Sequence, residues 1–112
     1  MSGFMQREEV VAAGGVTENI LAGSAFEFVG RPAIVTMGIT ASADGGFITI
    51  QGGSNIVLEE SQPRVVDRLP LIPDEMYYSF FAAPGDRLVI RLRNPSGGNI
   101  TFRALVQVVD VG

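Results

Sequence analysis

The groups in this sequence best suited to chemistry are arginines near its C-terminal end. All eight basic residues are arginine, and two stretches of alternating polar and apolar residues contain Arg87, Arg91, Arg93 and Arg103. A guanidinium is a planar fork that binds a carboxylate or a phosphate through paired hydrogen bonds. If the two stretches form a hairpin, Arg91 lies opposite Arg103, and the two like charges need an anion between them.

Three sources of that anion are open. One is the chain itself, through Glu59, Glu60 or Asp67, and another is the acidic side chains of an adjacent subunit. The third is the phosphate of a nucleic acid. A net charge of −4 argues against nucleic acid, and so does the lack of aromatic residues between the arginines.

A second group of interest is the run Asp74-Glu75-Met76-Tyr77-Tyr78. Two carboxylates beside two tyrosines are typical of a sugar site, but neighbours in an extended chain point to opposite faces and cannot flank one bond. We therefore expect no catalysis here. Both faces of this strand are apolar, so one face is expected in the core and the other beneath the proline-rich loop 61–73 or a partner subunit.

The residue types that are missing exclude most catalytic centres. The chain has no Cys, no His and no Lys, which removes the usual ligands of zinc, copper, haem and iron–sulfur clusters. Triads built on Ser–His–Asp or Cys–His are excluded for the same reason. Aspartates at turns lack the spacing of a calcium-binding EF-hand. We expect a protein that is not an enzyme and has no metal or cofactor.

The elements that position these side chains are short strands. Alternating apolar residues bounded by turn residues predict strands at 9–13, 16–21, 34–41, 47–51, 55–60, 76–82, 87–93 and 100–111. The turn Asp44-Gly45-Gly46 predicts one hairpin, and the loop 94–99 predicts another between the last two strands. The sequence predicts an all-β fold: a two-sheet antiparallel β-sandwich, jelly-roll-like, with about eight or nine short strands.

The predicted domain organisation is simple. Residues 1–8 are expected to form a flexible N-terminal arm, whose Phe4 and Met5 are candidates for docking on a neighbouring subunit, and residues 9–112 a single domain. The N-terminal residues lack the apolar run of a signal peptide. No stretch is long and apolar enough to predict a membrane span.

The run from Ala83 to Val109 carries a resemblance to a known group of proteins. Its Pro-Gly-Asp turn, alternating strand, Asn-rich loop and return strand resemble the closing hairpin of small jelly-roll or sandwich proteins in bacteriophage virions. Those proteins serve as capsid, decoration or other structural subunits. The resemblance covers about a quarter of the chain and implies a β-sandwich fold and a structural role.

The surface composition favours assembly. Charged residues make up only 18% of the chain, and several positions expected on the surface are small or apolar: Gly38, Ala41, Val89, Leu105 and Val109. Interfaces between subunits favour Arg and deplete Lys. This composition predicts self-association, and the resemblance of the closing segment implies a structural subunit of a phage particle, made in the host cytoplasm and located in the virion. Its expected partners are copies of itself and other virion proteins, and its interface candidates are Arg87, Arg91, Arg93, Arg103, Phe4, Met5, Tyr77 and Tyr78.

The alternative is a module that binds a carbohydrate or another small ligand on the strand of Tyr77 and Tyr78. Aromatic rings and polar groups together are typical of such sites. A subunit of a particle should associate with itself without ligand, whereas a binding module should stay small and be stabilised by its ligand.

Overall fold

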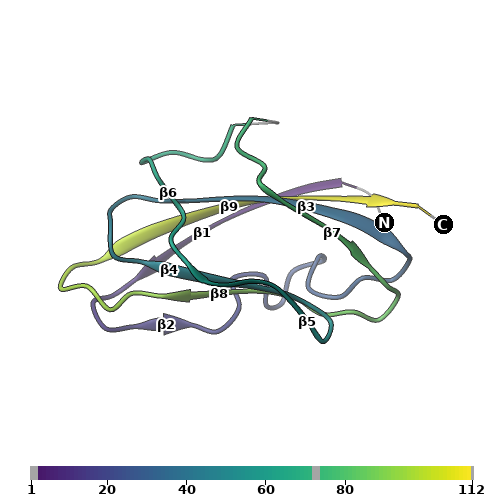
Figure 1. Cartoon of the computed structure of the whole chain (residues 1–112), viewed down its shortest axis with the longest axis horizontal. Coiled ribbons are helices and arrows are strands. Elements are labelled where there is room, and N and C mark those ends of the chain that lie inside the picture. The colour runs from purple at the N-terminus through teal and green to yellow at the C-terminus, as the bar shows by residue number, and fades with distance from the viewer. Residues whose placement is uncertain (1–2, 72–73, 112) are drawn as a thin grey trace.

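The computed structural model describes residues 3–71 and 74–111. These residues form strands β1 (Gly3–Val11), β2 (Val16–Thr17), β3 (Ala33–Ala41), β4 (Phe47–Gly52), β5 (Asn55–Ser61), β6 (Arg64–Val65), β7 (Tyr78–Ala82), β8 (Leu88–Arg93) and β9 (Ile100–Asp110). The strands lie in two facing sheets (Figure 1). Within the described ranges no helix is long and apolar enough to cross a membrane.

The order of the strands is that of a jelly roll. Sheet A has the order β1-β9-β3, and β3 pairs further with β7 along its first half and with β6 at its end. Sheet B has the order β2-β8-β4-β5. Apart from the two-residue parallel β6, strands therefore pair from the chain ends inward, as β1–β9, β2–β8, β3–β7 and β4–β5. This nested pairing confirms the predicted antiparallel two-sheet sandwich.

The core lies between the sheets and follows directly from the alternation in the sequence. Leu88, Ile90 and Leu92 of β8 point inward from sheet B, while Ile100 and Phe102 of β9 point inward from sheet A. All five side chains are at most 1% exposed. Burying a side chain of this size contributes roughly 1.5–3 kcal/mol, so these facing rows account for a large share of the stability of the sandwich.

Two predicted hairpins are wrong. The loop 94–99 crosses from β8 in sheet B to β9 in sheet A, and the Asp44-Gly45-Gly46 turn crosses from β3 to β4 in the same way. In the described residues, a hairpin between consecutive strands joins β4 to β5, where Gly52 pairs with Asn55. A hairpin within one sheet and a crossover between the two sheets both fit the alternation of apolar residues. In either case the apolar side chains of the two strands meet in the core.

A buried asparagine holds the crossover from β8 to β9. Asn94 is fully buried, and its Nδ2 donates to the backbone oxygens of Val11 at 2.8 Å and Gly98 at 2.7 Å. Its Oδ1 accepts hydrogen bonds from the amide and hydroxyl of Ser96. The side chain thus satisfies backbone groups that no strand partner reaches, which fixes the path of the loop between the sheets.

The expected arm at residues 1–8 is instead part of the sandwich from Gly3 onward. β1 pairs antiparallel with β9 from Gly3 opposite Val108 to Val11 opposite Ile100, without interruption. Met5 packs against the core, whereas Phe4 points outward and is 54% exposed. The backbone hydrogen bonds of the ladder, together with Met5, order this segment. Residues 1 and 2 lie outside the described residues.

Candidate functional site

The four C-terminal arginines do not share one face. Arg91 of β8 lies opposite Thr49 on the outer side of sheet B, and Arg103 of β9 lies opposite Thr40 and Glu8 on the outer side of sheet A. The predicted apposition of Arg91 and Arg103 is therefore wrong. It failed because it depended on the hairpin that the crossover loop replaces, so no anion is required between these two residues.

On sheet B the arginines contact carboxylates of the same chain. Arg93 Nε lies 2.7 Å from Glu60 Oε1, and its guanidinium also stacks 4.7 Å from the ring centre of Phe47. Arg91 contacts Glu18 at 3.3 Å and Glu60 at 3.9 Å. Arg87 contacts Glu27 at 2.8 Å. The hydrogen bond from the Gly23 amide, and after it the bond from Arg87, lower the pKa of the Glu27 carboxyl.

On sheet A, Arg103 lies between two carboxylates. Its Nη1 is 2.6 Å from Asp67 Oδ1, and its Nη2 is 3.4 Å from Glu8 Oε1. The hydrogen bond to Asp67 raises the pKa of Arg103. Glu60 and Asp67 are among the partners predicted within the chain. Glu8, Glu18 and Glu27 are not, because they lie 60 to 95 residues before their arginines in the sequence.

The segment between β6 and β7 folds over the outer side of sheet A. It is anchored by Glu75, a carboxylate whose structural role the sequence did not indicate. Glu75 is 4% exposed and forms ion pairs with Arg64 and with Arg68, the latter at 2.5 Å. Its Oε1 also accepts the Leu71 amide at 2.9 Å. The bonds from Arg68 and Leu71 hold the pKa of Glu75 at about 2, against an ordinary value of 4.5.

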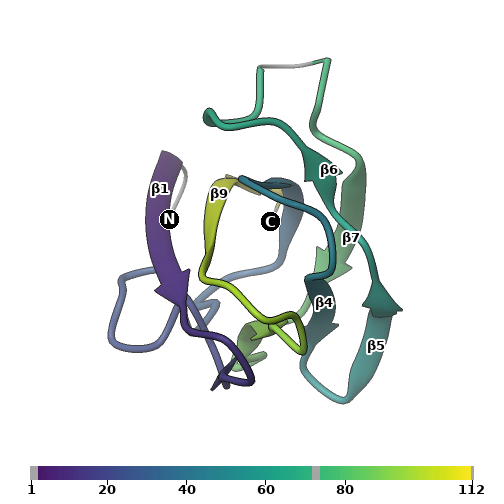
Figure 2. The same cartoon turned by 90° about the vertical axis from the view of Figure 1, so that its left-hand side faces the viewer.

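This segment, here called the strap (residues 66–77, of which 72 and 73 are not described), lies over β9 and the end of β3 (Figures 1 and 2). The hydroxyl of Thr40 donates to the Arg68 backbone oxygen at 2.5 Å. A Cβ on Gly38 would collide with the backbone oxygen of Glu75 and lie 2.9 Å from Pro70 Cβ. Gly38 is therefore small because the strap of its own chain lies against it.

The surface positions expected to signal assembly divide into two groups. Gly38 is buried under the strap, and its cross-strand neighbour Leu105 is 7% exposed. Ala41 points into the core with Ile39 and is 1% exposed. These positions therefore give no support to an interface. Val109, in contrast, points outward and is 43% exposed.

The part of sheet A that the strap leaves uncovered is uncharged. Ile34 pairs with Phe81 on one side and Val109 on the other, and these side chains are 37%, 58% and 43% exposed. The next row consists of Phe4, Gln107, Thr36 and Ser79. We call these seven residues the open half of the outer face, and the positions around Gly38, Thr40, Arg103 and Leu105 the covered half.

The two tyrosines do not form a shared binding surface. Tyr77 is 54% exposed, while Tyr78 lies opposite Met37, is half-buried and packs against the core. Burial raises the pKa of the Tyr78 hydroxyl, and Tyr77 adds to this effect. The rings meet edge to face at 6.4 Å. The strap leaves Phe81 on the outer side of β7 exposed, so the cover expected for this strand lies over β3 and β9 instead.

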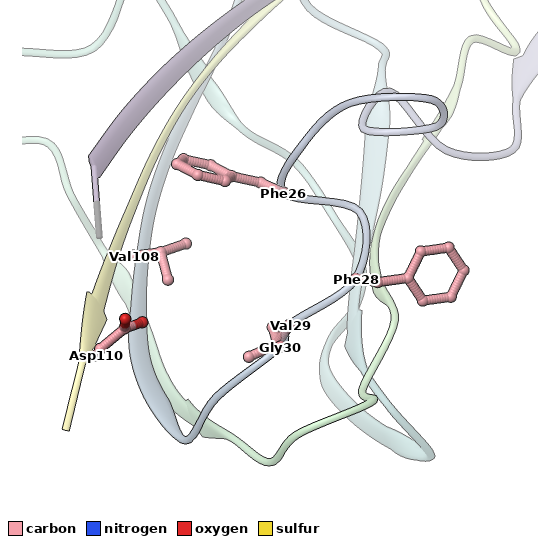
Figure 3. Close-up of a pocket in the computed structure, with 6 residues that line it drawn as sticks. All are labelled: Phe26, Phe28, Val29, Gly30, Val108 and Asp110. Atoms are coloured by element: carbon pink, nitrogen blue, oxygen red, sulfur yellow. The ribbon is translucent and has the colours of Figure 1, made fainter. Parts of the chain in front are cut away.

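Two hollows were considered as ligand sites. One lies between the loop 26–30 and β9, where Phe26, Val29 and Val108 point inward and Phe28 points away (Figure 3). Its volume of about 10 Å³ is room for roughly one water molecule. The other is a cleft of about 220 Å³ beside the strap, lined by Gln6, Arg7, Glu8, Leu69 and Arg103. It is smaller than the roughly 300–1,000 Å³ typical of ligand pockets.

Within residues 3–71 and 74–111, no three Asp or Glu side chains come close enough together to hold a metal ion. Of the turn aspartates, Asp86 accepts the Ala83 amide at 2.9 Å, and Asp67 binds Arg103. Both therefore have local structural partners.

Comparison with known proteins identifies no relative: no family model, no curated protein and no solved structure matches the chain significantly.

Proposed function

We propose that this chain is a non-enzymatic structural subunit that assembles with copies of itself, in a capsid or decoration role in a bacteriophage particle. The observation that carries the proposal is the open half of sheet A. Ile34, Phe81 and Val109 form a contiguous apolar row on a strand face that carries no charge to keep it hydrated. Contiguous apolar surface of this kind is typical of contacts with another protein.

The fold and the closing segment support the particle role. The jelly roll occurs in viral capsid proteins, although the same fold also serves lectins and cupins, so the fold alone does not decide between them. The run from Ala83 to Val109, which resembles phage structural proteins, contributes β8 and β9, the strands that bring the two inner rows of the core together. The resemblance and the open half favour the same role.

The arrangement of charges refines how copies would contact each other. Arg87, Arg91, Arg93 and Arg103 all have carboxylate partners within the chain. An exposed ion pair contributes only about 0–1 kcal/mol, and exchanging one partner for another gains little. Contacts between copies are therefore assigned to the apolar row of the open half, with the arginines holding loops and strands of each subunit in place.

The ligand-binding alternative has less geometric support. Tyr77 is exposed whereas Tyr78 packs against the core. The cleft of about 220 Å³ beside the strap is lined by charged side chains already engaged with each other, such as Glu8 and Arg103. A ligand would have to displace the ion pair between them. Neither of the two hollows is lined by a residue of the open half.

Light scattering across a range of protein concentrations tests the proposal. The wild type is expected to give masses that are multiples of 11.9 kDa, and the association should persist in high salt because apolar contacts are not screened. A mass of 11.9 kDa at every concentration would contradict the proposal.

Two phenylalanines provide a matched pair of variants for this measurement. Phe81 in the open half and Phe28 in the loop before β3 are both 58% exposed. Phe81→Arg should abolish association through the open half and so lower the mass, whereas Phe28→Arg should leave the mass unchanged. Equal effects of the two substitutions would show that general hydrophobicity, and not the open half, drives association.

A further inference from the structure

β1 is a long strand with one free edge. It pairs with β9 along nine residues, and within the described parts of the chain no strand pairs with its other side, where Figure 2 shows it at the margin of sheet A. Backbone N–H and C=O groups on such an edge are available to a strand from another molecule. A strand that adds there continues the sheet through main-chain hydrogen bonds.

The other sheet margins are blunted. β5 pairs with β4 through irregular register shifts, and Glu60 in it adopts a positive φ of 42°. β2 has two residues, and the far margin of sheet A is divided between the two residues of β6 and the five of β7. Short strands and bulges are common devices against edge pairing. β1 has no bulge in its register and no proline or lysine, and its charged residues Arg7, Glu8 and Glu9 restrict pairing to a strand of complementary charge.

The charges on β1 are complementary to those of a second β1 running the opposite way. Arg7 is exposed and Glu9 half-buried, and in the described residues neither takes part in an ion pair. Both point to the inner side of the sheet, since they lie opposite Ala104 and Phe102. Glu8 points to the outer side and is bound by Arg103.

We propose that β1 pairs antiparallel with β1 of a second copy of this chain, with Glu8 at the twofold axis. This inference rests on the proposed self-association and adds to the open half a second contact surface, with a defined register. Each Arg7 then lies directly opposite Glu9 of the partner subunit, and the two copies contribute two such ion pairs. Sheet A becomes continuous across the dimer.

Symmetry restricts the register, and charge favours an axis at Glu8 over one at Arg7 or Glu9. Directly opposite residues of an antiparallel pair lie on the same face, so the axis must pass through a residue and not between two. With the axis at Arg7, two arginines face each other, and with the axis at Glu9, two glutamates without arginine partners do. With the axis at Glu8, the facing carboxylates are each balanced by Arg103, which lies 3.4 Å away in its own chain.

Charge exchange tests the inference by sedimentation equilibrium. Arg7→Glu and Glu9→Arg should each weaken dimer formation roughly tenfold or more, because two attractive pairs become two repulsive pairs. The double variant Arg7→Glu/Glu9→Arg restores the pairs with reversed sign, and its dissociation constant should return to within about threefold of the wild type. Arg31→Glu, at an exposed arginine outside β1, changes the net charge as Arg7→Glu does and should have no effect.

The possible outcomes separate this inference from the proposed function. If the wild type associates but the single variants behave like Arg31→Glu, or the double variant fails to recover, pairing through β1 is overturned and association through the open half stands. If the wild type remains a single chain at every concentration, the proposed function fails and the dimer fails with it.

A cysteine cross-link tests the register independently. The chain has no cysteine, so a single introduced thiol can form a disulfide only with another copy. In Glu8→Cys the two thiols lie directly opposite, with Cβ atoms about 4.5–5.5 Å apart, and mild oxidation should give a covalent dimer. In Gln6→Cys they are offset by roughly 13 Å along the strands and should cross-link much more slowly. Faster cross-linking through position 6 would contradict the register.

Discussion

The outer face of sheet A has two halves that differ in what covers them. In the covered half, the strap lies on Gly38 and Thr40, and Glu75 anchors it through Arg64 and Arg68. In the open half, Ile34, Phe81 and Val109 are exposed. Both halves belong to the same strands, β3 and β9, so the difference lies in the strap and not in the sheet.

The comparison shows how apolar residues on an outer strand face should be interpreted. Gly38 and Leu105 are small or apolar because a segment of the same chain lies over them. Val109 is only four positions from Leu105 on β9, yet nothing in the described chain buries it to the same degree. A second molecule is the remaining way to bury such a row, and this is the physical basis of the proposed assembly.

The largest expected effect comes from placing the same charge in each half. Leu105→Arg should lower the free energy of unfolding by about 3 kcal/mol or more, because it buries a guanidinium under the strap. Val109→Arg should change that free energy by less than about 0.5 kcal/mol, but it should weaken self-association. Urea unfolding measures the free energy of unfolding of both variants, and light scattering measures their self-association. Similar losses of stability would remove the distinction between the halves.

Loss of the strap anchor is the next largest effect. Glu75→Gln leaves Arg64 and Arg68 without their buried partner, and should lower the Tm by several degrees and increase hydrogen exchange at Thr40 and Leu105. Asp74→Asn, at the exposed neighbouring residue, is the control and should change neither. An unchanged Tm in Glu75→Gln would show that the strap is held by other contacts.

The contribution of Glu75 to stability should depend on pH. The pKa of Glu75 is about 2 in the folded chain, against an ordinary 4.5, so its contribution is complete above pH 4.5 and is lost as the pH falls toward 2. The difference in stability between the wild type and Glu75→Gln should therefore narrow over that range. A constant difference would contradict the lowered pKa.

Close contact of the strap with Gly38 predicts a smaller effect. Gly38→Ala puts a Cβ against the Glu75 oxygen and 2.9 Å from Pro70 Cβ, and should cost about 1–3 kcal/mol of unfolding free energy. Gly97→Ala, where no atom lies within 4 Å of the added carbon, is the matched control and should be close to neutral. The midpoints of urea unfolding of the two variants measure this difference. A neutral Gly38→Ala would mean that the strap does not pack closely against β3.

The smallest expected effect compares two threonines on β3. Thr40 donates to the Arg68 backbone oxygen under the strap, and Thr40→Val should cost about 1 kcal/mol. Thr36 in the open half is 3.3 Å from the Ser79 hydroxyl in a solvent-accessible position, and Thr36→Val should cost less than about 0.5 kcal/mol. Denaturant titration resolves this difference, and the reverse order would contradict the account of the two halves.

The fold class was predictable because its signals are local. Alternation along 87–93 and 100–111 identifies the inward residues Leu88, Ile90, Leu92, Phe102 and Ala104, and the structure places all of them in the core. The same alternation does not specify the partner strand. It therefore also predicts a hairpin of β8 and β9, which lie in facing sheets. The predicted arm at residues 1–8 is wrong from Gly3 onward, because β9 orders that segment.

The candidate site was predictable only where exposure follows from the strand's own pattern. Phe4 and Val109 are exposed, as their positions implied. Glu75 stands out in the sequence only as a carboxylate beside two tyrosines. Its pairing with Arg64 and Arg68 is not predictable, because these arginines lie 11 and 7 residues earlier, across prolines, and meet it only when the strap folds over sheet A. Ala41 was misassigned to the surface although its alternation with Thr40 and Ile39 points it inward.

The most direct test of the central claim is hydroxyl-radical labelling of the wild type, analysed residue by residue at low and at high protein concentration. Phe81 and Phe28 are equally exposed in the single chain, at 58% each. Self-association through the open half predicts that labelling of Phe81 decreases at high concentration while labelling of Phe28 stays constant. If both residues are labelled equally at every concentration, or if Phe28 alone is protected, the open half is not the surface through which copies of this chain meet.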